Sequence, residues 1–210
     1  MIQNIFLIII AYLLGSISSA VWIGKRFYGI DVREHGSKNA GATNVMRVLG
    51  RKAALPVFAI DFMKGFSAVK LSLLAVGIDD PSHMFYMEMG LAIAAVIGHI
   101  FPIFAKFKGG KGVATIAGAA LSMTAIPVLL SLLTFIVVLF ITKYVSLGSM
   151  AGGISYPLFL VFVTNETIEQ VVFGVIVAIA LITTHRKNIK RLIKGEESKT
   201  YLIRKWKQKE

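Results

Sequence analysis

Six long apolar runs divide this chain, and they limit most strongly what it can fold into. They span residues 2–23, 53–78, 84–105, 112–142, 145–163 and 168–184. A helix of roughly 20 such residues crosses the hydrocarbon core of a bilayer. Hydrophobic residues make up 56% of the chain and charged residues only 16%, whereas about a quarter of a soluble domain is charged. We therefore predict an all-α integral membrane protein.

The basic residues predict its orientation. Lysine and arginine number seven in residues 25–52, three in 106–111 and ten in 186–210, while the connections near residues 79–80 and 164–169 carry only acidic charges. Basic segments stay on the cytoplasmic side. If residues 112–142 crossed the membrane only once, the basic tail would lie on the outer side. They are expected to form two short helices turning near Pro127, or a re-entrant hairpin.

Two crossings there give about seven transmembrane helices, with the N-terminus outside and the C-terminus cytoplasmic; a hairpin gives five. The first run is followed by Lys25 and Arg26 and lacks a basic start, so we expect a retained span and not a cleaved signal peptide. No internal repeat is visible. We expect one membrane domain, residues 1–210, with a basic cytoplasmic tail from 186 to 210.

A glycine-lysine loop, F-K-G-G-K-G-V-A-T at residues 107–115, precedes the fourth run. Its glycines allow the backbone to approach a ligand closely, and the start of the following helix favours an anion. Backbone amides around Gly110–Gly112 could also stabilise an oxyanion. These features predict a phosphate site formed by Lys108, Gly109, Gly110, Lys111 and Gly112. The alternative is a basic turn whose lysines reach lipid head groups.

Two further cytoplasmic segments carry polar side chains suited to phosphate. Residues 36–47 read G-S-K-N-A-G-A-T-N-V-M-R, and an arginine fork can hold two phosphate oxygens. The candidates there are Ser37, Lys38, Asn39, Thr43, Asn44 and Arg47. In H-R-K-N-I-K-R, His185 and Asn188 share a helical face, as do Asn188 and Arg191. The alternatives are a capped loop and a basic helix lying on anionic lipid.

Three ionisable groups, Asp61, Lys64 and Lys70, fall inside the second run, and a histidine lies near the end of the third. Asp61 and Lys64 are three residues apart, which favours a structural ion pair. His99 is expected to be a hydrogen-bonded structural group. The histidine spacing suggests no metal site, and the chain has no cysteine.

Several motifs together give the chain a family resemblance. They are L-G-S near Gly15, G-S-K-N-A-G-A-T-N-V-M-R, D-F-M-K-G at Asp61, G-H-I-F-P at His99, F-K-G-G-K-G-V-A-T, Y-V-S-L-G-S at 144–149 and H-R-K-N-I-K-R-L-I-K-G-E-E. In this order they resemble the acyl-phosphate-dependent glycerol-3-phosphate acyltransferases of bacterial inner membranes. One departure is Ile17-Ser18, where many members have a proline.

The resemblance implies transfer of an acyl group from acyl phosphate to the 1-hydroxyl of glycerol 3-phosphate, giving lysophosphatidate and inorganic phosphate. It implies catalytic roles for Ser37, Arg47, Lys108, Lys111, Ser146, His185 and Asn188, and a structural role for Glu197, with Glu196 as the only rival. The proton acceptor stays open between His185 and a substrate phosphate oxygen. Beyond the two substrates and membrane lipid, we expect no cofactor, metal, nucleic acid or obligate protein partner.

Other functions are weighed by their motifs. The H-x4-D pattern of acyl-CoA-dependent acyltransferases, the nucleotide P-loop and the D-G-x2-A-R pattern of alcohol phosphatidyltransferases are absent from the sequence. The remaining alternative is a membrane transporter of a phosphorylated solute. Transporters usually place their site near the midplane between repeated halves, whereas the polar motifs here gather at one predicted face.

Overall fold

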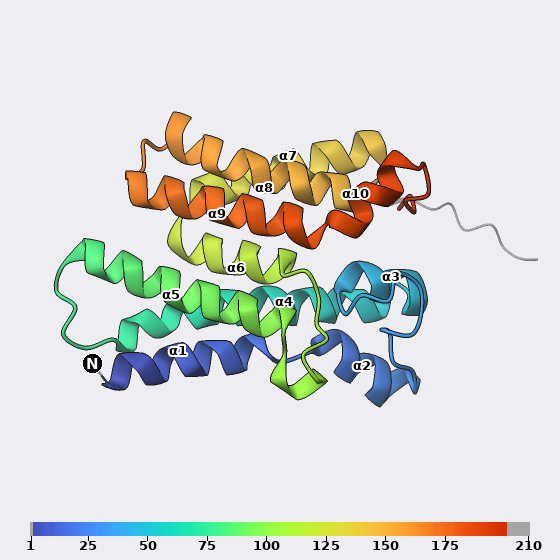
Figure 1. Ribbon diagram of the computed structural model, residues 1–210, viewed down its shortest axis with the longest axis horizontal. Helices are drawn as coiled ribbons and strands as arrows, with labels where there is room; N and C mark the ends of the chain where they lie inside the picture. Colours follow the sequence, from blue (N-terminus) through green and yellow to red (C-terminus); the bar gives the residue numbers. More distant parts are fainter. Residues whose placement is uncertain (1, 201–210) are drawn as a thin grey trace, which may run out of the picture. The chain divides into compact units, whose positions relative to one another are not determined.

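The computed structural model describes residues 2–200, and every regular element in this range is a helix (Figure 1). Contacts divide the chain into two compact units, Met1–Val128 and Leu129–Glu210. The first unit contains α1 (Ile2–Gly15), α2 (Ser19–Tyr28), α3 (Ala42–Leu49), α4 (Arg51–Lys70), α5 (Pro81–Ile100), α6 (Val113–Met123) and the short 3-10 helices η1 (Leu71–Leu74) and η2 (Ile103–Ala105). The second contains most of α7 (Ala125–Thr142), then α8 (Val145–Phe162), α9 (Ile168–Thr184) and α10 (Arg186–Ile193). The basic tail beyond residue 200 lies outside the described residues.

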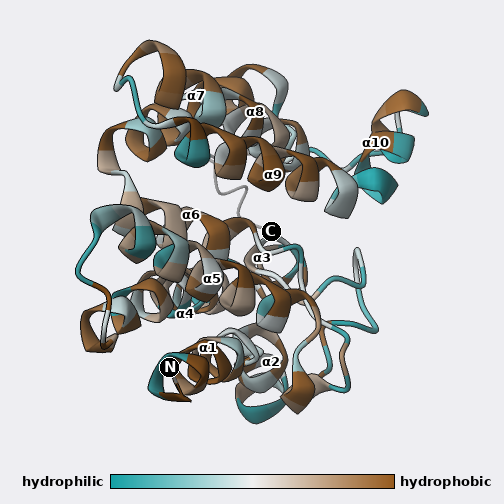
Figure 2. Ribbon diagram, turned by 60° about the vertical axis from the view of Figure 1, so that its left-hand side comes forward, coloured by the Kyte–Doolittle hydropathy of each residue, from teal (hydrophilic) through white to brown (hydrophobic). Residues whose placement is uncertain are grey.

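The apolar runs form helices that consist predominantly of hydrophobic residues (Figure 2). Within residues 2–200, Pro81–Ala105, Ala125–Thr142 and Val145–Phe162 are long and apolar enough to cross a membrane, and counting each bent helix pair as one span gives up to five. The helix α4 is 20 residues long but includes Asp61, Lys64 and Lys70. The helix α6 is apolar but has only 11 residues. The described helices thus agree with an integral membrane protein.

Two predicted runs are interrupted. The first is divided into α1 and α2, which meet at an angle of 41°. The run 112–142 forms two helices, α6 and α7, as expected, and they are separated at Thr124, three residues before Pro127. Pro127 instead lies in the first turn of α7, where a missing N–H is tolerated because that group has no partner within the helix.

Helices in the first unit approach each other through glycines. A Cβ on Gly15 of α1 would lie less than 3.0 Å from the Ala95 carbonyl oxygen of α5, and a Cβ on Gly65 of α4 would lie equally close to the Thr115 carbonyl oxygen of α6. Small residues that bring backbones together are typical of helix packing in membranes. The packing places α5 beside α1 and α6 beside α4 (Figure 1).

In the second unit, α7 and α8 pack in the same way. A Cβ on Gly148 or Gly152 of α8 would lie 2.9 Å from the carbonyl oxygen of Phe135 or Ser131, respectively.

A buried ion pair joins α4 to the bend between α1 and α2. Lys64 Nζ lies 2.8 Å from Asp61 Oδ1, as predicted, and donates a 2.8 Å hydrogen bond to the Ile17 carbonyl oxygen. The Ser19 hydroxyl donates to Asp61 Oδ1 at 2.8 Å. Because the helix is broken at this point, the Ile17 carbonyl needs such an external donor.

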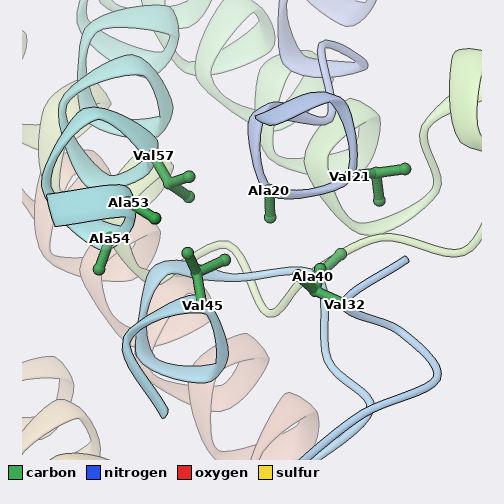
Figure 3. Close-up of a cluster of buried hydrophobic side chains, with 8 residues drawn as sticks. All are labelled: Ala20, Val21, Val32, Ala40, Val45, Ala53, Ala54 and Val57. Atoms are coloured by element: carbon green, nitrogen blue, oxygen red, sulfur yellow. The ribbon is translucent and has the colours of Figure 1, made fainter. Parts of the chain in front are cut away.

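A cluster of small apolar side chains anchors the segment between α2 and α3. It comprises Ala20, Val21, Val32, Ala40, Val45, Ala53, Ala54 and Val57 (Figure 3). Val32 and Ala40 come from the two ends of that segment, whereas the other six side chains belong to α2, α3 and α4. Their burial fixes the polar residues between positions 32 and 40.

Candidate active site

Asn44 organises the first polar segment. Its side chain is 1% exposed, and its Oδ1 accepts hydrogen bonds from the Ser37 backbone N–H at 2.8 Å and hydroxyl at 3.1 Å. Its Nδ2 donates to the carbonyl oxygens of Val32 at 2.8 Å and His35 at 3.1 Å. These four bonds use the full capacity of the amide, so Asn44 shapes the loop and has none left for a phosphate.

The remaining candidates of this segment lie on or beside α3. Arg47 is one helical turn after Asn44 and half-buried, so the two share a face. Thr43 is half-buried in the first turn of α3, and Lys38 is exposed with a left-handed backbone. Asn39 borders Gly41, where an added Cβ would meet its Nδ2 at 2.9 Å.

The glycine-lysine loop folds back onto the end of α5. The Gly109 N–H donates to the Ile100 carbonyl oxygen, and the Gly110 N–H donates to that of His99, both at 3.1 Å. Both amides therefore make hydrogen bonds that fold the loop. This differs from the expectation that the Gly110 amide stabilises an oxyanion. The glycines are needed because the chain is crowded: a Cβ on Gly109 would lie less than 3.0 Å from both carbonyl oxygens.

His99 lies where the segment before α3 meets the glycine-lysine loop. A Cβ on Gly110 would lie less than 3.0 Å from His99 Nε2 and from the Ala40 carbonyl oxygen, which places both groups against Gly110. On its other side, His99 Nδ1 lies 3.2 Å from Thr115 Oγ1 and 3.6 Å from Asp61 Oδ1. His99 is therefore buried and hydrogen-bonded, as expected.

A second link joins the same segments. Arg33 Nη1 donates to the carbonyl oxygens of Ala105 at 2.8 Å and Lys108 at 3.3 Å. In the sequence, Arg33 stands out only as one of the seven positive charges in residues 25–52. Its sole signal there is the acidic residue Asp31 two positions earlier.

The end of the loop is built as predicted, with a helix directly after it. Gly112 has φ 83°, a left-handed conformation that favours glycine, and α6 begins at Val113. Of the two loop lysines, Lys108 is exposed and Lys111 is half-buried.

A buried carboxylate organises the candidate residues of the second unit. Glu197 is 6% exposed, and its Oε1 accepts from the Ser146 hydroxyl at 2.9 Å and from Asn188 Nδ2 at 2.7 Å. Arg191 Nε lies 2.6 Å from Oε2, so Asn188 and Arg191 share a face of α10, as predicted. Glu196 is exposed, and the carboxylate with the structural role is therefore Glu197.

These contacts set the ionisation of Glu197. Burial raises the pKa of this carboxyl, but hydrogen bonds from Asn188, Arg191 and Ser146 lower it by more, so the pKa lies below its ordinary value of 4.5. The group is thus an anion that holds Ser146 and Asn188 in place.

His185 is buried at the 59° bend between α9 and α10. Its Nδ1 lies 2.7 Å from the Leu181 carbonyl oxygen. A carbonyl can only accept, so Nδ1 carries the proton and Nε2 is the basic nitrogen of the neutral ring. In residues 2–200, no group of three or more His, Asp or Glu side chains is arranged to hold a metal ion.

Comparison with known proteins decides the family. The sequence profile described as glycerol-3-phosphate acyltransferase matches residues 5–195. The chain belongs to this family of acyltransferases. The glycerol-3-phosphate acyltransferase of Thermoanaerobacter sp. (strain X514) is 44% identical over 191 residues, covering 91% of this chain and 92% of that one. That of Bacillus velezensis is 45% identical over 193 residues, covering 92% and 95%.

Solved structures agree with the glycerol-3-phosphate acyltransferase assignment. The chain is similar to the crystal structure of PlsY (YgiH), an integral membrane glycerol 3-phosphate acyltransferase, in its glycerol 3-phosphate form. The TM-score is 0.85 and the identity 38%, with 95% of this chain and 96% of that one covered. The lysophosphatidic acid form matches with a TM-score of 0.81. The transporter alternative is therefore not favoured.

Proposed function

We propose that this membrane enzyme transfers an acyl group from acyl phosphate to the 1-hydroxyl of glycerol 3-phosphate. The hydroxyl oxygen attacks the acyl carbonyl carbon, the bond from that carbon to the phosphate oxygen breaks, and phosphate leaves with the electron pair. The products are lysophosphatidate and inorganic phosphate. Since phosphate is a good leaving group, little acid assistance is required.

The observation that carries the proposal is the convergence of two phosphate-type segments in the first unit. Arg33 joins the segment before α3 to the carbonyl oxygens of Ala105 and Lys108, while Ala40 and His99 meet at Gly110. The two segments that meet here contain the cations and hydroxyls proposed to bind phosphate, among them Ser37, Arg47, Lys108 and Lys111. Such a set matches substrates that each bear a phosphate.

Ser37 and Arg47 are the proposed phosphate ligands from the first segment. The Asn44 oxygen accepts both the N–H and the hydroxyl of Ser37. The Ser37 hydroxyl can therefore turn its proton toward a phosphate oxygen, while the hydrogen bond from the Ser37 backbone N–H to Asn44 still holds the residue in place. Arg47 supplies a fork for two oxygens, and Lys108 and Lys111 supply further positive charge.

The hydroxyl proton has two proposed acceptors, His185 Nε2 and a substrate phosphate oxygen. The tautomer of His185 supports the first of these. Ser146 and Asn188, both bonded to Glu197, are proposed to contribute polar groups to the reaction.

We further propose a bacterial inner-membrane protein with about seven spans and its site at the cytoplasmic face. This count requires α4 and α6 to cross in addition to the five apolar candidates. The position of the basic segments supports it, as does the chemistry, because glycerol 3-phosphate is soluble whereas each acyl methylene held in hydrocarbon contributes roughly 0.8 kcal/mol.

A reconstituted assay tests the reaction. Purified protein in detergent should release phosphate only when acyl phosphate and glycerol 3-phosphate are both present, with lysophosphatidate formed in equal amount. Replacing acyl phosphate with acyl-CoA should give no product. Product from acyl-CoA, or phosphate release without glycerol 3-phosphate, would contradict the proposal.

A further inference from the structure

One guanidinium group binds the backbone on both sides of the turn at Lys106 and Phe107, where the glycine-lysine loop begins. Arg33 Nη1 donates to the Ala105 and Lys108 carbonyl oxygens, at 2.8 and 3.3 Å. The two acceptors come immediately before and immediately after Lys106 and Phe107. A change in the position of Arg33 therefore acts directly on the backbone of the candidate phosphate-binding lysine, Lys108.

The enclosed turn is strained. Lys106 and Phe107 both have φ 56°, and two consecutive non-glycine residues in the left-handed region persist only where the surroundings hold them. Within the loop, the Phe107 N–H donates to the Pro102 carbonyl oxygen at 2.9 Å, and the Lys108 N–H donates to that of Ala105 at 3.3 Å. Arg33 supplies the additional bonds from outside the loop.

Arg33 is itself fixed before any substrate binds. Its Nε and Nη2 donate to Asp31 Oδ1 and Oδ2 at 2.9 and 2.6 Å, and Lys25 Nζ lies 3.3 Å from Oδ2. Val32, between the two partners, is fully buried in the cluster of Figure 3. The guanidinium thus links a rigid anchor to the loop.

We infer that Arg33 is a positioning residue of the active site, which sets the place of Lys108 by clamping the turn at Lys106 and Phe107. The inference rests on the proposed function, in which Lys108 meets a substrate phosphate. The clamp needs a planar fork that binds a carboxylate and the carbonyl oxygens together. A lysine at the same position keeps the charge but cannot make all of these bonds.

Kinetics of Arg33→Ala and Arg33→Lys test the clamp, with Arg26→Ala, an exposed arginine of α2, as the matched control. Both Arg33 variants should lose about 10- to 100-fold in kcat/KM for glycerol 3-phosphate, the range for removing a charge-assisted hydrogen bond. The Arg26 variant should match the wild type. Full activity in Arg33→Lys would show that only charge matters and would overturn the clamp.

Cysteine labelling tests the same inference without activity, since the chain has no native cysteine. With Lys106→Cys as the reporter, maleimide should react faster when Arg33→Ala is added, while Lys190→Cys on α10 should be unaffected. Asp31→Asn serves as a milder variant should Arg33→Ala lower the melting temperature. An unchanged rate at position 106 would overturn the clamp. An inactive wild type with faster labelling would instead contradict the proposed function alone.

Discussion

The side-chain oxygen of Asn44 accepts hydrogen bonds from both the backbone N–H and the hydroxyl of Ser37. A residue that looked like a phosphate ligand in the sequence thus holds a proposed ligand in position. This relationship separates two kinds of mutational effect in the same segment.

Ser37→Ala should reduce turnover by at least about 100-fold, as expected when a transition-state hydrogen bond is lost, and leave the melting temperature unchanged. Asn44→Ala should instead lower stability, by about 2–4 kcal/mol for four bonds to a buried amide, together with activity. Activity assays paired with thermal melts in detergent separate the two. An Asn44→Ala protein that is stable but inactive would indicate that Asn44 binds a substrate phosphate directly.

Gly109→Ala should be more damaging than Gly110→Ala. The methyl at position 109 meets backbone carbonyl oxygens, whereas at position 110 one close neighbour is the end of the His99 side chain, which can move. We expect lower melting temperatures for both, and not simply a raised KM for glycerol 3-phosphate. Gly90→Ala is the control, because its Cβ would make an ordinary 3.7 Å contact with Ile8. Raised KM with unchanged melting at position 110 would favour a direct phosphate contact.

The depressed pKa of Glu197 predicts acid sensitivity in the second unit. Because the folded pKa lies below 4.5, the stabilisation is complete above the unfolded pKa and is lost as pH falls through the folded one. Glu197→Gln should melt at a lower temperature near neutral pH and show a flatter pH dependence below about pH 5. Identical pH curves for both proteins would show that the carboxylate charge is not stabilising.

His185→Ala distinguishes the two proton acceptors. If Nε2 is the base, the variant should lose about 100-fold or more in kcat, and the acidic limb of the pH–rate profile should disappear. His185→Gln retains a polar side chain without a titrating ring and should behave in the same way. An unchanged profile would assign the proton to a substrate phosphate oxygen.

Single cysteines test the proposed orientation. Replacements at Lys38 and Lys190 should resist an impermeant thiol reagent added to intact cells, and one at Asp80 should react, since the basic segments are proposed to be cytoplasmic. Permeabilised cells provide the control, in which all three should label. Labelling of the Lys38 replacement from outside would refute both the orientation and the site.

Local patterns predicted the elements of this fold better than its contacts. The runs 145–163 and 168–184 correspond to α8 and α9 within one residue at each end, because an apolar run bounded by polar residues fixes a helix directly. The ion pair of Asp61 and Lys64 followed from helical spacing. The break before Ser19 follows Gly15, the last residue of α1, and carries no proline. It depends on two side chains of α4, because Lys64 donates to the Ile17 carbonyl oxygen and Asp61 accepts from the Ser19 hydroxyl.

The sequence predicted which segments carry the candidate site residues, but not the contacts that hold these residues in place. Arg33 donates to backbone carbonyl oxygens more than 70 positions away. Every residue has such a carbonyl, so the sequence does not show which ones Arg33 binds. The choice between Glu196 and Glu197 is likewise decided by burial, which separates two adjacent identical residues. For the same reason, the polar pattern of residues 36–47 suggested a substrate ligand at Asn44, although the partners of its side chain lie within its own loop.

The hydrogen bond from Lys64 to the Ile17 carbonyl oxygen has a consequence for divergence within the family. In a straight first helix, a backbone N–H of the same helix would donate to the Ile17 carbonyl oxygen. The buried ammonium of Lys64 would then lose one of its hydrogen-bond partners. A homologue that straightens this helix should therefore also replace its lysine and aspartate with neutral residues. The bend and the ion pair should be inherited or lost together.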